Sequence, residues 1–130
     1  MVITSGRVVA GKIVVDGENV GWFSRRDDAR ARYAGKVVDR LQDVLEPSIK
    51  DLRIMIDCAN GAAWPAAGVA FQRAGITADY LGTAADGVNI NRGCGSTDLA
   101  LLSTAVVSGG YDVGIAYDGD ADRMVAVDEE

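Results

Sequence analysis

The stretch that decides the fold is residues 54–81, IMIDCANGAAWPAAGVAFQRAGITADYL. It opens on a continuous β-prone run at 54–58, which is typical of a buried strand, and it ends on a second β-prone run at 77–81. Between the two runs lies an alanine-rich segment, 62–74, followed by Gly75, a residue type that often terminates helices. The pattern therefore predicts one strand–helix–strand unit.

Further elements follow this unit along the chain. A loop rich in glycine and asparagine at 82–96 leads to a helix that we expect Ser96 or Thr97 to cap and that runs to about residue 108. Segment 112–117 reads as a third strand, and 124–127 as a fourth that can return antiparallel beside it. The order predicts an α/β fold with a mixed, mostly parallel four-stranded sheet, helices on both faces and an antiparallel last strand.

The residues before this domain show two other patterns. Apolar runs alternate with glycine over 1–23, which predicts a β-hairpin or an extended arm. Apolar positions then repeat at helical spacing behind Ser24, a candidate N-cap, and predict one amphipathic helix at about 25–46. We therefore expect an arm at 1–23 that is the remnant of a preceding domain, a linking helix within 24–50 and an α/β domain at 51–130, all cut from something longer.

Composition narrows the class of protein. The 130 residues are 48% hydrophobic and 25% charged, as in an ordinary folded domain. The net charge is −6 and the basic residues are mostly scattered, which argues against a nucleic-acid partner. No signal peptide and no apolar run long enough for a membrane span occur, so we expect a cytoplasmic protein without a membrane partner. The two cysteines lie far apart and histidine is absent, which disfavours zinc and a histidine base.

The most informative loop is 118–123, Asp-Gly-Asp-Ala-Asp-Arg. Carboxylates of Asp118, Asp120 and Asp122 can converge on a turn, where they repel one another unless a cation or a proton neutralises them. Oxygen ligands favour a hard ion such as magnesium, calcium or manganese. A solvated acidic turn without an ion is the alternative on spacing alone.

Two other metal-dependent interpretations are weaker. An EF-hand requires glycine at the sixth position of its loop, where this chain has Arg123, and it requires flanking helices rather than β-prone segments. In a haloacid-dehalogenase type phosphatase Asp118 would be the nucleophile and Asp120 the acid or base. That family needs a later lysine and further acidic ligands, yet only seven residues follow Arg123.

Three motifs in order carry a family resemblance. The loop at 118–123 matches the metal motif Asp-Gly-Asp-x-Asp-Arg, and it follows Asp-Cys-Ala-Asn-Gly-Ala at 57–62 and Asp-Gly-Val-Asn-Ile-Asn-Arg-Gly-Cys-Gly-Ser-Thr at 86–97. Together they resemble the second, metal-binding domain of the phosphohexomutase superfamily. Within it they look like the bacterial phosphoglucosamine mutase family rather than the phosphomannomutase branch.

The resemblance implies both an activity and roles for residues. It implies interconversion of glucosamine 6-phosphate and glucosamine 1-phosphate through a bisphosphate, on the route to UDP-N-acetylglucosamine and the cell wall. Mg²⁺ would be held by Asp118, Asp120 and Asp122. Arg123 would be the catalytic residue that faces the reacting phosphate, or else a salt-bridge partner of the aspartates. The loop asparagines, which we expect to fix loop geometry rather than to contact substrate, are Asn60, Asn89 and Asn91.

The resemblance also shows what this chain does not supply. The family's serine nucleophile lies in a loop that contains histidine, and segment 2–5 only echoes its start before Gly6 and Arg7. We therefore expect a phosphosugar substrate, the missing catalytic domains as partners, an inactive isolated chain and a tendency to self-associate through exposed apolar surface. The alternatives are another phosphohexomutase, a phosphoglucomutase or phosphomannomutase, and a non-catalytic module for metal binding or assembly.

Overall fold

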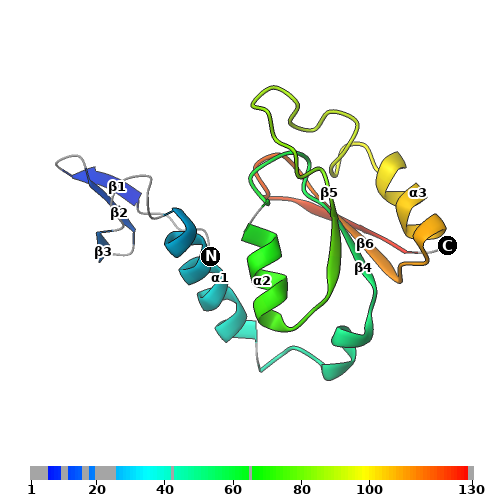
Figure 1. The fold of residues 1–130 in the computed structure, drawn as a ribbon, viewed down its shortest axis with the longest axis horizontal. Coiled ribbons are helices and arrows are strands. Elements are labelled where there is room, and N and C mark those ends of the chain that lie inside the picture. Colours follow the sequence, from blue (N-terminus) through cyan, green and yellow to red (C-terminus); the bar gives the residue numbers. More distant parts are fainter. Residues whose placement is uncertain are drawn as a thin grey trace.

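The computed structural model describes residues 6–9, 12–15, 18–19, 26–41, 43–64 and 66–128 (Figure 1). A four-stranded sheet organises the part after residue 50, in the order β5-β4-β6-β7. Strand β4 pairs in parallel with β5 and β6, and β6 pairs antiparallel with β7. The strands span Ile54–Asp57 (β4), Ala78–Leu81 (β5), Val113–Tyr117 (β6) and Met124–Val127 (β7). The predicted α/β fold is thus confirmed, including the antiparallel last strand.

The strand register decides where the loops meet. Asp57 at the end of β4 lies opposite Leu81 of β5 and Ala116 of β6. Because parallel strands end at the same edge of a sheet, the loops that leave β4, β5 and β6 emerge side by side. The aspartate loop is one of these three, as Figure 1 shows near the end of β6.

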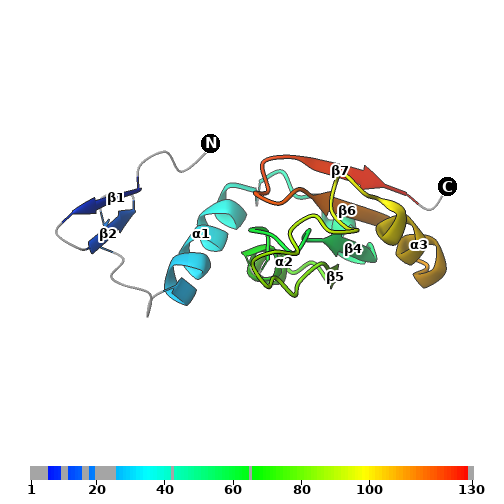
Figure 2. The same ribbon diagram turned by 90° about the horizontal axis from the view of Figure 1, so that it is seen from above.

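Each face of the sheet is covered by a helix. Helix α2 (Ala66–Ala74) lies on one face and α3 (Ala100–Gly109) on the other (Figures 1 and 2). Side chains alternate along a strand, so β4 contributes to two separate cores. Ile54 and Ile56 belong to the core that includes residues of α2, whereas Met55 packs with residues of α3. This burial on both faces explains why Ile54, Met55 and Ile56 are apolar without alternation.

Helix α1 (Arg26–Leu41) forms a further layer against α2 (Figure 1). Its buried side includes Ala34 and Val38, which are 0% and 6% exposed. The Arg73 guanidinium of α2 donates a hydrogen bond to the Ala31 carbonyl and lies directly against Gly35. An amphipathic helix is therefore present before the domain, as the spacing predicts.

Three helix boundaries differ from the prediction. The first helix ends at Leu41 rather than near 46, and a 3-10 helix, η2 (Pro47–Asp51), follows it. Helix α2 begins four residues later than predicted, after a turn in which the amide of Ala62 donates to the Gly119 carbonyl. Helix α3 begins at Ala100, and Ser96 instead donates its amide to the Tyr117 carbonyl. The expected cap at Ser96 or Thr97 is therefore wrong.

The N-terminal segment forms a small antiparallel sheet of its own, in the order β1-β2-β3. Its strands are β1 (Gly6–Val9), β2 (Lys12–Val15) and β3 (Glu18–Asn19), which extends the expected hairpin by one short strand. Ser5 and Ser24 lie outside the described residues. In the described part of the chain no helix is long and apolar enough to cross a membrane.

Candidate metal centre

The aspartate loop is a tight connection between β6 and β7. The amide of Asp118 donates to the Arg123 carbonyl at 3.2 Å, and the amide of Ala121 donates to the Asp118 carbonyl at 3.1 Å. Ala121 has a φ of 64°, a left-handed conformation that a residue with a side chain adopts at some cost. These bonds fold six residues back on themselves, so that the alternate aspartates face a common point.

The three aspartates converge as their spacing predicts. One carboxylate oxygen from each of Asp118, Asp120 and Asp122 lies within 4.8 Å of the others. Asp118 is buried, at 1% exposure, whereas Asp120 and Asp122 are exposed. The cluster therefore has one fixed carboxylate at its base and two that open toward solvent.

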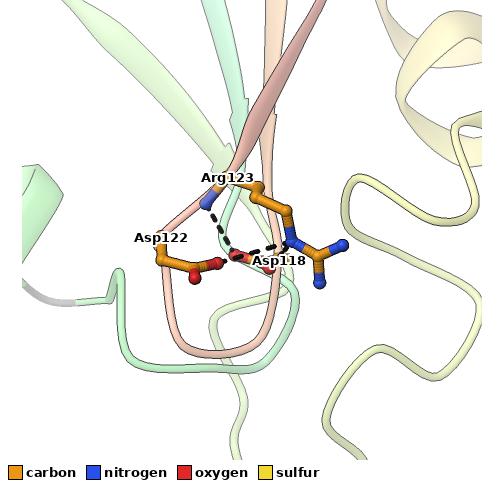
Figure 3. Close-up of polar contacts among 3 residues, drawn as sticks. All are labelled: Asp118, Asp122 and Arg123. Atoms are coloured by element: carbon orange, nitrogen blue, oxygen red, sulfur yellow. Dashed lines mark hydrogen bonds and ion pairs between the residues drawn. The ribbon is translucent and has the colours of Figure 1, made fainter.

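Arg123 is bound to this cluster (Figure 3). Its Nε lies 2.7 Å from Asp118 Oδ2 and 3.4 Å from Asp122 Oδ1. Its backbone amide donates to Asp118 Oδ1 at 3.2 Å. Of the two alternatives that the sequence left open, the structure contains the salt bridge. The two terminal guanidinium nitrogens nevertheless point away from the aspartates, and the side chain is 72% exposed.

The electrostatics of the loop are those of crowded negative charge. Burial acts to raise the pKa of Asp118, but the hydrogen bonds from the Arg123 amide and guanidinium outweigh it and hold that pKa below its ordinary value. The pKa of Asp122 is raised, first by its hydrogen bond with Asp118 and then by the charge of Asp120. A divalent cation at this point would relieve the same repulsion.

Two neighbouring loops hold the backbone on both sides of Asp118. The amide of Ser96, from the loop after β5, donates to the Tyr117 carbonyl at 2.9 Å. The amide of Ala62, from the turn after β4, donates to the Gly119 carbonyl at 2.9 Å. These contacts join segments far apart in the sequence, and spacing alone does not indicate them.

The loop after β5 is itself organised by side chains. Asn60 Oδ1 accepts from the Ala84 amide, and Asn89 accepts from the Asp86 amide while donating to the Ala84 carbonyl. For Asn60 and Asn89 the predicted role in loop geometry is therefore confirmed. Asn91 contributes through its backbone, whose amide donates to the Ala59 carbonyl at 2.9 Å.

Comparison with known proteins identifies the class. The family model described as phosphoglucomutase/phosphomannomutase, alpha/beta/alpha domain II, matches residues 31–130. The chain therefore belongs to the phosphoglucomutase/phosphomannomutase family, which confirms the resemblance seen in its motifs. It corresponds to the second domain of that family.

Particular relatives narrow the comparison. A phosphoglucosamine mutase from Thermobifida fusca is 45% identical over 122 residues, which is 94% of this chain and 26% of the relative. One from Sphingopyxis alaskensis is 44% identical over 117 residues, which is 90% of this chain and 26% of the relative. The chain thus spans about a quarter of the length of these curated relatives.

A solved structure shares the fold. A phosphoglucomutase/phosphomannomutase family protein from Burkholderia thailandensis superposes with a TM-score of 0.63 at 24% identity. The match covers 91% of this chain and 30% of the other chain. It supports the architecture described above.

Proposed function

We propose that this chain is the cation-binding domain of a phosphoglucosamine mutase, which interconverts glucosamine 6-phosphate and glucosamine 1-phosphate through a bisphosphate. The observation that carries the proposal is the convergence of three carboxylates within 4.8 Å on the last loop of a domain from this family. The relatives that share 44–45% of its residues are phosphoglucosamine mutases, which favours this activity over another phosphohexomutase.

The donor set fits Mg²⁺. Asp118, Asp120 and Asp122 offer only oxygen atoms, which suit a hard divalent ion. Two of the three carboxylates open to solvent, so water and a phosphoryl oxygen can complete the coordination. When bound, the ion would withdraw charge from the phosphoryl group during transfer.

Arg123 would serve the same reaction from beside the metal. Its Nε secures Asp118, while its terminal nitrogens point away from the loop and can donate to a phosphoryl oxygen. A guanidinium suits this double task because its donors form a rigid, planar fork. Arg123 would thus orient a ligand carboxylate and bind the reacting group at once.

The family match disfavours the phosphatase alternative, because the phosphoglucomutase/phosphomannomutase domain II model covers residues 31–130 of this chain. A cytoplasmic location also belongs to the proposal, and the free, buried thiols of Cys58 and Cys94 agree with a reducing compartment.

A chimaera tests the activity directly. Residues 31–130 would replace the matching segment of the Thermobifida fusca enzyme. The formation of glucosamine 1-phosphate would then be followed in a coupled assay. We expect turnover in the chimaera and its loss on Asp120→Asn. Asp43→Asn, at an exposed position before the domain, is the matched control and should retain activity. A folded chimaera that binds metal without turnover would favour a non-catalytic module.

The isolated chain should bind Mg²⁺ weakly. Three carboxylates without a phosphoryl ligand leave most of the coordination to water, which Mg²⁺ surrenders reluctantly. Calorimetry should give a dissociation constant in the millimolar range, which corresponds to a binding free energy of about −4 kcal/mol. Nanomolar affinity, or a strong preference for Zn²⁺, would contradict the proposed site.

A further inference from the structure

A buried carboxylate lies at the end of the central strand. Asp57 is 0% exposed, and each of its oxygens accepts a backbone amide. Oδ1 accepts from Ala59 at 2.8 Å, and Oδ2 accepts from Gly95 at 2.7 Å. One partner lies in the turn after β4 and the other in the loop after β5. The buried carboxylate of Asp57 therefore joins two loops, because each of its oxygens accepts a hydrogen bond from a different loop.

Both loops also form hydrogen bonds with the backbone at the aspartate loop. One residue beyond Gly95, the Ser96 amide holds the Tyr117 carbonyl, and three residues beyond Ala59, the Ala62 amide holds the Gly119 carbonyl. Tyr117 and Gly119 flank Asp118 in the chain. The two segments that bond to the backbone on either side of Asp118 are thus both hydrogen-bonded to the carboxylate of Asp57.

The backbone around Asp57 is shaped to permit these contacts. Ala59 and Asn60 have φ values of 57° and 50°, which side-chain-bearing residues rarely adopt without support. A Cβ at Gly82 would lie 2.6 Å from Asp57 Oδ1, so glycine is required at this position, directly after β5. The turn after β4 is therefore held in a costly conformation by the bonds that it makes.

We propose that Asp57 is a positioning residue of the metal centre, which sets the place of Asp118 through the loops after β4 and β5. The proposal rests on the function proposed above for the aspartate loop. Asp57 need not touch the ion or the substrate, because it acts on the backbone that carries a ligand. Such indirect support determines how well converging ligands match an ion.

Asp57→Asn is the sharpest variant. The side-chain amide keeps the shape of the carboxylate but presents an NH₂ group to one of the two backbone donors, so one loop loses its bond. Val106→Ala is the control, because it opens a cavity between α3 and the face of the sheet on which Met55 lies. It removes none of the hydrogen bonds that join the loops. Mn²⁺ binding would be measured by the loss of the free-ion EPR signal, at a temperature where circular dichroism shows every variant folded.

We expect Asp57→Asn to weaken Mn²⁺ binding roughly tenfold, as supporting residues of metal sites do, and Val106→Ala to leave it unchanged. If wild type binds no Mn²⁺, or if Asp120→Asn makes no difference, the proposed metal function itself fails. If Asp120→Asn removes binding while folded Asp57→Asn binds as wild type does, only the role of Asp57 is overturned.

A second measurement covers the case in which Asp57→Asn does not fold. Coupling between two sites is reciprocal, so an ion that uses this scaffold must also stabilise it. In wild type, Mg²⁺ should slow hydrogen exchange of the Gly95 and Ser96 amides as well as those of the aspartate loop. Slowing confined to residues 118–123 would overturn the proposal.

Discussion

Gly61→Ala tests whether the turn after β4 and the aspartate loop are in backbone contact. An ideal Cβ at position 61 would lie 2.3 Å from the Gly119 carbonyl oxygen. Real Cβ contacts are essentially never shorter than 3.0 Å, so the two loops must separate by at least about 0.7 Å. Gly61 is not among the glycines with positive φ, so the added methyl acts by collision rather than by backbone strain.

The cost of this separation has two parts. Overpacking a dense region costs about 1–3 kcal/mol, and the displaced Gly119 carbonyl weakens its bond with Ala62, which is worth about 1 kcal/mol. We therefore expect the free energy of unfolding to fall by about 2–4 kcal/mol. Displacing Gly119 also moves Asp120, so Mn²⁺ affinity should fall about tenfold.

Urea denaturation followed by circular dichroism measures the first effect, and EPR titration of Mn²⁺ measures the second. Gly68→Ala is the matched control, because Gly68 lies in helix α2 and its Cβ would meet only the ring of Trp64, at 3.2 Å. That control should keep its metal affinity. If Gly61→Ala unfolds at the same urea concentration as wild type and binds Mn²⁺ equally well, the two loops are not in the contact described.

Four further outcomes are expected. Asp120→Asn should remove cation binding without lowering the metal-free melting temperature, since it relieves repulsion in the loop, and a clear drop would instead make this aspartate a structural acceptor. Arg123→Gln should weaken Mn²⁺ binding roughly tenfold, because the Nε that holds Asp118 Oδ2 in place is lost, with Arg92→Gln as a control without effect. Tighter binding would mean that the positive charge of Arg123 chiefly competes with the ion for Asp118. Burial raises the pKa of Cys58 from 9.0 to about 12, so the stability that this neutral thiol contributes is full below pH 9.0 and is lost as the pH rises toward 12. Urea unfolding should show this decline in the free energy of unfolding, and Cys58→Ala should make the decline shallower. The chain alone, with glucosamine 6-phosphate, Mg²⁺ and a trace of the 1,6-bisphosphate, should form no 1-phosphate above a blank, because its 130 residues contain no histidine, a residue of the family's serine loop.

Local patterns in the sequence predicted much of the fold. A continuous β-prone run indicated β4, because that strand is buried on both faces, and helical spacing indicated α1 because only one side of it is covered. The aspartates at alternate positions predicted their own convergence, since a turn of six residues brings them near one another. These features depend on neighbours within a few residues.

Helix starts were predicted less well, because they depend on distant partners. Ser96 has the residue type of an N-cap, yet its amide is taken by the Tyr117 carbonyl and the helix begins later. Ala62 has a high helix propensity, but its amide bonds to Gly119. These amides bond to carbonyls that the sheet brings near, and both helices begin further along the chain.

The sequence by itself thus determined the order of the elements and the three aspartates, which follow from periodicity and short spacing, and its motifs carried the resemblance to the family. Only the tertiary structure decided that Asp57 holds Gly95, 38 positions away, and that these loops grip the backbone around Asp118. The reason is physical. Which amide meets which carboxylate depends on the parallel register that gathers three loops at one edge of the sheet, and no local pattern carries that information.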